Sequence, residues 1–297
     1  MSTLTDRAVA AAVAVARTHG LACDRPAILH DRCNVLVHLA PSPVVARVAT
    51  ETAAARGEAI GDFLAREVAL GRHLAASSAP TVPPATELPP GPHTHDGLHL
   101  TFWRLIDHDT DRPLDPTELG TTLHALHVAL AGFDGSLAPY APLGESIRLL
   151  DQLEASGAYS ASELAPMRRA ADRWLPFYAD TLRGPLQALH GDPHRSNVLR
   201  TPEGLVWTDF EDSAIGPIEW DLACLVAVGR CWGPPAPETE LALAAYGPHD
   251  ADKLARMVDV RALLVAAWTL FLGQRDDESR ARAATRLAWW REREELH

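Results

Sequence analysis

The chain has 297 residues, of which 47% are apolar, and this is enough to build one large domain or two smaller ones. Its formal net charge of −12 argues against nucleic acid or an anionic membrane as the main partner, because both require a basic surface. No run approaches the roughly 20 apolar residues that a membrane-spanning helix needs, so we expect no membrane segment.

The N-terminal segment predicts an amphipathic helix. Apolar residues recur at helical spacing over residues 4–18, with Thr5 or Asp6 as the cap and Gly20 as the stop. Arg17 and polar residues interrupt the apolar stretch, and no basic start precedes a long apolar centre. The segment therefore does not have the pattern of a signal peptide.

The following residues predict a small antiparallel sheet with one long helix. Apolar spacing predicts the helix over 57–76. A proline-rich connector, "APTVPPATELPPGP", follows it, and "PSP" at 41–43 predicts a hairpin turn. Runs rich in β-branched or aromatic residues predict the strands, at 27–31, 34–40, 44–50 and 97–106.

The pattern of the chain changes at the polar segment 107–115. Beyond it we expect helices at 116–133, at 161–182 and over most of the chain from Pro217 onward, with short strands before His190, near Val198 and at 205–208. We therefore predict a sheet-rich N-lobe at 1–106 and a helix-rich C-lobe at 107–297. Four cysteines lack zinc-site or redox-pair spacing, so we expect free thiols in a cytoplasmic protein.

Two polar stretches of the C-lobe lie between segments whose apolar residues indicate burial. "HGDPHRSN", at 190–197, holds Asp192 and Asn197, and "TDFED", at 208–212, puts Asp209 at the end of an apolar run. Phosphoryl transfer needs a carboxylate to accept the proton of the attacking hydroxyl and Mg²⁺ held by hard oxygen ligands. The pattern predicts such a site, with Asp192 as the base. The alternative is a pair of turns that these side chains cap.

Together with "GPIEWDLA", at 216–223, these stretches resemble the catalytic and metal-binding loops of the aminoglycoside phosphotransferase family. That family consists of small-molecule kinases related to choline and homoserine kinases. The resemblance implies an α+β, bilobal protein-kinase-like fold, with a small antiparallel-sheet N-lobe and a mainly helical C-lobe. The roles that it implies are the catalytic base for Asp192, Mg²⁺ ligands for Asn197 and Asp209, and structural support of the site for His190 and Asp221.

By the same resemblance, the N-lobe holds ATP or GTP. "VVARVA" is similar to the strand that carries the phosphate-binding cation, usually lysine and here Arg47, and Glu67 takes the place of its partner. The hairpin "HDRCNVLVHL" takes the place of the phosphate-covering hairpin but has no glycine, and only Asn34 in it is family-like. Backbone groups near Trp103 are expected to contact the adenine or guanine ring of the nucleotide. The alternatives are a solvent-facing Arg47, a turn amide at Asn34 and an ordinary helical position for Glu67.

The expected function is transfer of the γ-phosphoryl group of ATP or GTP to a hydroxyl of a small molecule, an aminoglycoside or another antibiotic. The alternatives are a metabolite kinase for an amino alcohol or sugar, and a catalytically inactive nucleotide-binding regulator. We expect a monomer or homodimer whose partners are Mg²⁺, the nucleotide and the hydroxyl acceptor, with no nucleic acid and no membrane.

The helices after residue 232 are expected to form the acceptor site. A cationic acceptor is expected if their acids face the cleft, and a neutral or amphipathic one if aromatic residues form the wall instead. The acids are Glu238, Glu240, Asp250, Asp276, Asp277 and Glu278. The aromatic residues are Trp232, Tyr246, Trp268 and Phe271.

Several histidines are expected to be structural. His93, His95, His99 and His108 lie close together beside the proline-rich connector, where no carboxylate or cysteine frame matches a metal site, so a solvated loop is expected. His194 is expected to pack within its loop.

Overall fold

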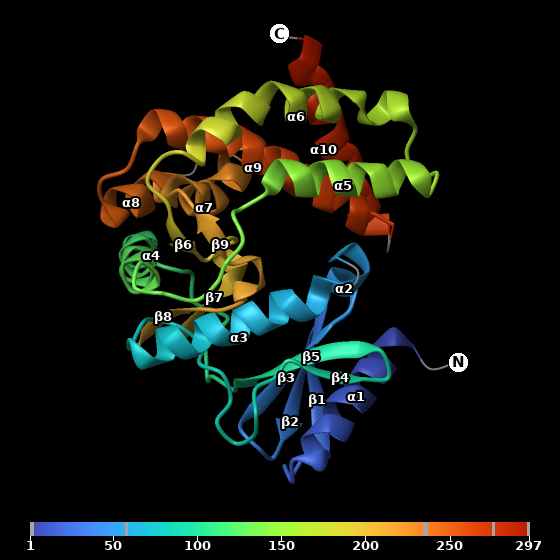
Figure 1. The fold of residues 1–297 in the computed structure, drawn as a ribbon, viewed down its shortest axis with the longest axis vertical. Helices are drawn as coiled ribbons and strands as arrows, with labels where there is room; N and C mark the ends of the chain where they lie inside the picture. The colour runs from blue at the N-terminus through green and yellow to red at the C-terminus, as the bar shows by residue number, and fades with distance from the viewer. Residues whose placement is uncertain (1–2, 57–58, 234–236, 275–276, 296–297) are drawn as a thin grey trace. The chain divides into compact units, whose positions relative to one another are not determined.

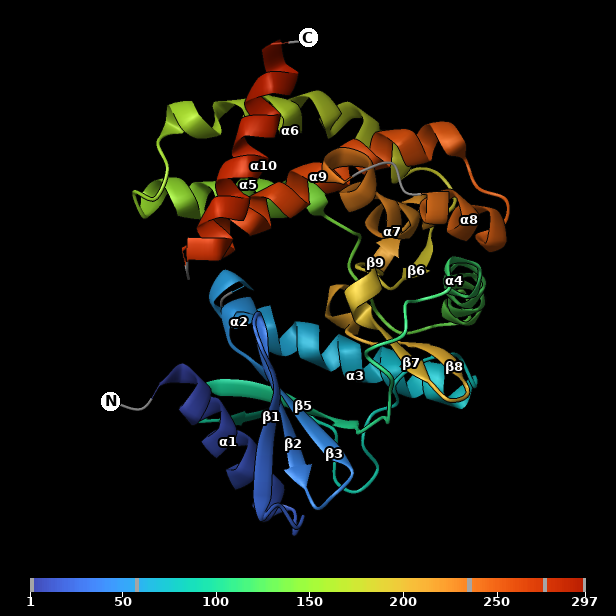
Figure 2. The ribbon, with the colours of Figure 1, turned by 180° about the vertical axis from the view of Figure 1, so that it is seen from behind.

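A computed structural model describes residues 3–56, 59–233, 237–274 and 277–295 of the chain (Figures 1 and 2). The chain forms two compact units. Unit 1 comprises Met1–Leu137, His190–Ser213 and Ala244–Gly247, and unit 2 comprises Ala138–Leu189, Ala214–Leu243 and Pro248–His297. The lobe boundary near residue 107 stays a prediction.

A five-stranded antiparallel sheet, counted over the described residues, is the base of unit 1, with the strand order β1-β2-β3-β5-β4. The predicted strands and the hairpin between the second and third are confirmed. The strands are β1 (Arg25–Asp31), β2 (Asn34–Ala40), β3 (Val44–Ala49), β4 (His93–His95) and β5 (Leu98–Arg104).

Strand β4 corrects the expectation of a solvated loop around the first histidines. His93–His95 pair with Leu98–Leu100 across a tight turn, in which Asp96 and Gly97 have φ of 50° and 73°. Aspartate followed by glycine adopts this left-handed backbone readily, and an Asp-Gly turn is typical of a hairpin. The turn signal was therefore present in the sequence.

Helix α1 (Leu4–Thr18) covers one face of this sheet, and its apolar side packs against alternate residues of β2, β3 and β5. The helix itself is confirmed, but its cap is Thr3 and not Thr5 or Asp6. The Thr3 hydroxyl accepts from the Asp6 amide at 3.1 Å, and the Asp6 carboxylate accepts from the Thr3 amide at 3.0 Å. This reciprocal pair satisfies two backbone donors at the helix start.

Helix α3 (Ile60–Ala76) lies on the opposite face of the sheet (Figures 1 and 2). It confirms the predicted helix over 60–76, whereas residues 57–58 lie outside the described residues. Successive side chains of a strand point to opposite faces. Since Val44, Ala46 and Val48 pack with α1, Arg47 projects toward the α3 face. A short helix that was not predicted, α2 (Glu51–Arg56), follows β3.

The rest of unit 1 carries the polar stretch between short elements. Helix α4 (Pro116–Leu130) is capped by Asp115, whose carboxylate accepts from the amides of Thr117 and Glu118. The elements near the polar stretch are η2 (Arg195–Asn197), β7 (Val198–Thr201), β8 (Gly204–Trp207) and η3 (Phe210–Asp212). Trp207 exchanges backbone hydrogen bonds with Pro80 and Val82, which fixes the end of β8 to the proline-rich connector.

Unit 2 is mainly helical, as predicted for this part of the chain. Its α9 packs against α5, α7 and α10. Its elements are α5 (Pro142–Ala155), α6 (Ala161–Thr181), β6 (Gln187–Leu189), β9 (Ala214–Gly216), α7 (Ile218–Trp232), α8 (Pro237–Tyr246, whose last residues belong to unit 1), α9 (Ala251–Leu272) and α10 (Asp277–Glu295). Within the described part of the chain, no helix is both long and apolar enough to cross a membrane. The cysteines Cys23, Cys33, Cys224 and Cys231 are thiols and not disulfides.

Candidate active site

The loop at 190–197 is anchored by a fully buried histidine. His190 Nε2 lies 3.0 Å from the Thr208 carbonyl oxygen, and its Nδ1 lies 3.3 Å from the Asp192 amide. Since the amide can only donate, Nδ1 accepts and the ring proton is on Nε2. One neutral imidazole thus joins the Asp192 backbone to the segment that ends β8.

Asn197 closes the same loop from its other end. Its Nδ2 donates to the Asp192 carbonyl oxygen at 2.9 Å, and its backbone oxygen accepts from the Thr208 amide at 3.0 Å. With the nitrogen of the amide turned toward Asp192, the amide oxygen faces the other way. The loop therefore presents Asp192 and the Asn197 oxygen from a backbone that hydrogen bonds hold at both ends.

His194 lies against the predicted base. Its Nδ1 accepts from the Ser196 amide at 3.2 Å, so Nε2 carries the proton, and Nε2 is 3.4 Å from Asp192 Oδ2. The sequence had favoured a packing role over a catalytic one. The structure shows a polar contact with Asp192, whose carboxylate is about one-fifth exposed, at 21%.

Asp209 follows β8 in a backbone conformation that few residues adopt. Its φ of 67° and ψ of 64° are left-handed, which costs a residue with a side chain roughly 1–2 kcal/mol and which aspartate tolerates better than most. The conformation directs its carboxylate to Arg47 Nη2 at 3.0 Å. Burial raises the pKa of Asp209 to about 6, with Arg47 opposing the rise and the Glu211 and Asp192 carboxylates adding to it.

Arg47 is the centre of the charged cluster and is only 4% exposed. Its Nη1 donates to Glu67 at 3.1 Å, and its Nη2 donates to Asp209 and to Glu211. A buried guanidinium is stable only when it is paired. The three carboxylates raise the pKa of Arg47 against the opposing effect of burial, so it stays charged. The structure thus brings Arg47, Glu67 and Asp209 together, although they are far apart in the sequence.

Two members of this cluster were missed by sequence reasoning. Glu211, 8% exposed, had no assigned role, and Thr52, 1% exposed, was not considered. Thr52 Oγ1 lies 3.4 Å from Glu211 Oε1. No local pattern marks either residue, because each acquires its role from segments about 160 positions away in the chain.

Asn34 also contacts Arg47. In the orientation of the Asn34 amide that matches donors with acceptors, its oxygen accepts from Arg47 Nη2 at 2.7 Å. Its nitrogen then donates to Thr52 Oγ1 and to the Cys33 carbonyl, both at 3.2 Å. The residue is 6% exposed. The amide therefore takes part in the Arg47 cluster, and its contact with a nucleotide stays a prediction.

The side chain of Trp103 belongs to the core of unit 1. It packs with Val68 and Val82, and its Nε1 donates to the Thr101 hydroxyl at 2.9 Å. Just beyond it, the Leu105 amide donates to the Pro43 carbonyl. Contact of the backbone near Trp103 with a nucleotide base stays a prediction.

Asp221 lies in the first turn of α7, in unit 2, and is fully buried. Its predicted support of the catalytic loop, which lies in unit 1, also stays a prediction.

The donor set suits Mg²⁺ better than a softer metal. Over the described residues, no group of three or more His, Cys, Asp or Glu side chains is arranged to hold a metal ion. Mg²⁺ is typically held by one or two protein oxygens and completed by phosphates and water. Asp209 and the Asn197 amide oxygen fit that pattern. The three carboxylates on one guanidinium leave an excess of negative charge that a divalent cation would balance.

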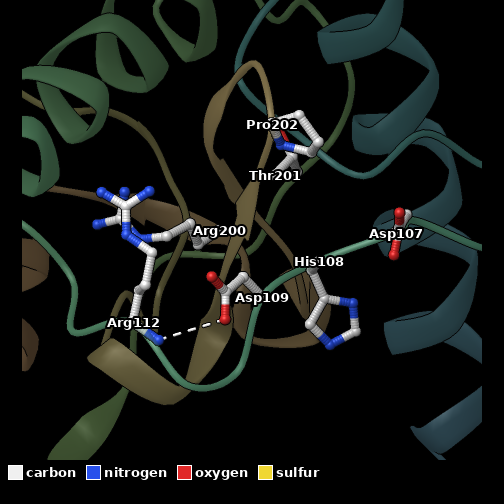
Figure 3. Close-up of a pocket in the computed structure, with 7 residues that line it drawn as sticks. All are labelled: Asp107, His108, Asp109, Arg112, Arg200, Thr201 and Pro202. Carbon is white, nitrogen blue, oxygen red and sulfur yellow. Dashed lines mark hydrogen bonds between the residues drawn. The ribbon is translucent and has the colours of Figure 1, made fainter.

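A separate small pocket lies beside the segment that follows β5. It has a volume of ≈ 240 Å³ and is lined by Asp107, His108, Asp109, Arg112, Arg200, Thr201 and Pro202. In Figure 3 the guanidinium groups of Arg112 and Arg200 lie on one side of Asp109, and Asp107 and His108 lie on the other. The predicted catalytic, metal and nucleotide residues are not part of this lining, so the pocket is distinct from the Arg47 cluster.

The family model of the "Phosphotransferase enzyme family" (APH) matches residues 28–258 of the chain. The chain belongs to this family. None of the curated protein sequences compared with the chain matches it. As a member of the APH family, the protein is a small-molecule kinase, and the match spans every predicted residue from Asn34 to Asp221.

Solved structures confirm the kinase-like α+β fold of this APH-family chain. An amicoumacin kinase in complex with AMP-PNP, Ca²⁺ and its ligand superposes with a TM-score of 0.70 at 12% identity, over 91% of this chain and 89% of that one. A choline/ethanolamine kinase family protein from Mesorhizobium loti has a TM-score of 0.65 at 21% identity, over 97% and 94%. An aminoglycoside phosphotransferase in complex with GDP and kanamycin has a TM-score of 0.66 at 17% identity, over 95% and 98%.

Proposed function

We propose that the protein transfers the γ-phosphoryl group of ATP or GTP to a hydroxyl group of a small molecule, with Mg²⁺ as its metal. The observation that supports this best is the Arg47 cluster, in which a buried cation meets Asp209 beside the Asp192–Asn197 loop. The arrangement also supports an active enzyme over the inactive regulator, because the chain keeps the residue types that phosphoryl transfer requires: a carboxylate, metal-binding oxygens and a cation.

Each residue has a distinct task in the proposed reaction. Asp192 orients the acceptor hydroxyl and takes its proton as the oxygen attacks the γ-phosphorus and the bond to the leaving diphosphate breaks. Asn197 and Asp209 would hold Mg²⁺, which supplies charge neutralisation for the phosphates when bound. Arg47 directs its guanidinium to the nonreacting phosphates, and Glu67 fixes its orientation through the bond of 3.1 Å. His190 keeps the Asp192 backbone in place.

Calorimetry tests this proposal directly. The protein is titrated with ATP and with GTP, each in Mg²⁺ and in chelator, and phosphate transfer to a panel of hydroxyl compounds is then followed by phosphorus NMR. We expect tight binding of at least one nucleotide only with Mg²⁺, because Asp209 and Asn197 would hold the metal, and the metal would neutralise the charge of the phosphates. Absence of nucleotide binding in Mg²⁺ would refute the function.

The variant Arg47→Ala is expected to raise the nucleotide KM by about 10- to 100-fold, the effect of losing a hydrogen bond to a charged group. The acceptor KM should change much less. Arg47→Lys should retain partial activity, because it keeps the charge but loses the planar fork. Arg17→Ala, on the exposed side of α1, is the control. An unchanged nucleotide KM in Arg47→Ala would show that the cation comes from another residue.

We propose an amine-bearing hydroxyl compound as the acceptor, an aminoglycoside or another antibiotic, or an amino alcohol of metabolism. The support is the net charge of −12 and the likeness to proteins whose names include choline, ethanolamine and kanamycin, which are hydroxyl compounds with a cationic amine or quaternary ammonium group. A neutral sugar is the alternative acceptor.

The acids expected at the acceptor wall give this proposal little support. Three of the acids pair with nearby arginines: Glu240 with Arg230 at 2.9 Å, Asp277 with Arg280 at 2.5 Å and Glu278 with Arg282 at 2.9 Å. Their charge is thus partly neutralised, and Asp250 caps α9. Asp276 lies outside the described residues. Among the aromatic candidates, Tyr246 is buried against His127 in unit 1, whereas Trp268 donates to Glu145 at 2.9 Å in unit 2.

A salt titration distinguishes a cationic acceptor from a neutral one. For a cationic acceptor, raising the salt from about 0.05 to about 0.5 M shortens the screening length from roughly 14 to 4 Å and should raise the acceptor KM severalfold. The KM of a neutral hydroxyl compound from the same panel serves as the control. A flat response of the amine acceptor would discard the cationic assignment and leave the kinase assignment intact.

A further inference from the structure

Three polar side chains, those of Asn34, Thr52 and Glu211, form a closed ring of hydrogen bonds with the guanidinium of Arg47. Asn34 Oδ1 accepts from Arg47 Nη2 at 2.7 Å, and Asn34 Nδ2 donates to Thr52 Oγ1 at 3.2 Å. Thr52 Oγ1 is 3.4 Å from Glu211 Oε1, and Glu211 Oε2 accepts from Arg47 Nη2. The ring thus joins β2, β3, the start of α2 and η3.

The single hydroxyl proton of Thr52 has two acceptors within reach. The Cys33 carbonyl oxygen and Glu211 Oε1 both lie 3.4 Å from Thr52 Oγ1. The carbonyl already accepts from the Thr52 amide and the Thr50 hydroxyl, both at 3.1 Å, and from the Asn34 amide. Because a carbonyl has two lone pairs, it is saturated, and the proton goes to Glu211. Thr52 then accepts from Asn34 and donates to Glu211, which closes the ring.

Every member of the ring is at least nine-tenths buried, with exposed fractions of 6% for Asn34, 4% for Arg47, 1% for Thr52 and 8% for Glu211. Hydrogen bonds in such surroundings are strengthened, and breaking one leaves a buried group unsatisfied. Any change at Thr52 therefore reaches Arg47 through both neighbours, Asn34 and Glu211.

We infer that Thr52 is a positioning residue that sets the orientation of the Arg47 guanidinium toward the nucleotide phosphates. This inference rests on the proposed function. A guanidinium binds phosphate through a planar fork, so its orientation matters in a way that the orientation of a lysine ammonium does not. Glu67 holds Nη1, and Nη2 is shared between Asp209 and the ring. The same ring ties the hairpin tip to this cation, in a hairpin that has no glycine.

The test compares Thr52→Val with the matched control Thr50→Val in the full chain. Valine keeps the volume of threonine but has no hydroxyl, and the Thr50 hydroxyl bonds to the same Cys33 carbonyl outside the ring. Calorimetry measures the binding of AMP-PNP to each variant in the presence of Mg²⁺. We expect Thr52→Val to raise its Kd by about tenfold. Thr50→Val and Thr52→Ser, which restores the hydroxyl, should both stay within about twofold of the parent.

Melting temperature and a double-mutant cycle separate positioning from general stability. Thr52→Val and Thr50→Val should melt within a few degrees of each other, whereas only the first weakens binding. In a Glu211→Gln background, Thr52→Val should have a smaller effect than in the parent, because both changes break one ring. Additive effects, an unchanged Kd in Thr52→Val, an equal loss in Thr50→Val or a failed rescue by serine would each overturn the inference.

The same titrations separate this inference from the function on which it rests. A parent that binds AMP-PNP and a Thr52→Val variant that binds it equally well would remove only the role of Thr52. A parent that binds no nucleotide would remove the phosphotransferase function, and the inference with it.

Discussion

Replacing Asp192 with asparagine is expected to lower the turnover number of phosphotransfer by about 10²-fold or more, the usual cost of removing a general base. The substitution keeps the shape of the side chain and leaves the backbone bonds to His190 and Asn197 in place. The loop should therefore keep its conformation, and the Kd for Mg²⁺–nucleotide should change little. Turnover should fall because the substitution removes the proton acceptor.

Turnover, nucleotide Kd and melting temperature of Asp192→Asn are measured on the same preparation. Asp111→Asn, on the exposed loop before α4, is the control for loss of one carboxylate. Full turnover in Asp192→Asn would reject the assignment of this residue as the base. Loss of binding and of thermal stability together would show instead that Asp192 is needed for the structure of the loop.

Gly191→Ala is expected to destabilise the protein by on the order of 3 kcal/mol or more, the range of severe steric and backbone effects. Gly191 has a φ of +92°, and a Cβ at this position would lie 1.9 Å from the Asp212 carbonyl oxygen and 2.4 Å from its carbon. The Asp212 backbone cannot rotate away from the added Cβ as a side chain could. The loop that carries Asp192 and the turn that carries Glu211 are in contact at this point.

Thermal and denaturant unfolding of Gly191→Ala measure this loss, with Gly20→Ala as the matched control. Gly20 has a similar left-handed φ of +75°, but nothing lies within 4 Å of its added Cβ, so only the strain of about 1–2 kcal/mol applies. Equal stability losses in the two variants would contradict the close approach of Gly191 to Asp212. Any folded Gly191→Ala protein should also bind Mg²⁺–nucleotide more weakly.

The sequence was sufficient for most elements and for the chemical identity of the site. Period-2 and helical spacing are local properties, so the strands near Arg47 and the helix that carries Glu67 could be placed from neighbouring residues alone. The spacing of Asp192 to Asn197 within one loop was equally local. The predicted helix cap was misplaced, since it is Thr3, and strand β4 and helix α2 were not predicted. A cap or a short element involves too few residues to show a clear apolar period.

The tertiary structure alone decided the surroundings of Arg47. Its bonds to Asp209 and Glu211 span 162 and 164 positions of the chain, and no periodicity extends that far. The packing of β3 against α3 and η3 decided that Arg47 is buried, that Glu211 is its partner and that Thr52 links Glu211 to Asn34. Sequence determines which side chains are available to carry a proton or a charge. The distances between them depend on how distant segments pack, because burial and hydrogen-bond geometry are properties of the folded chain.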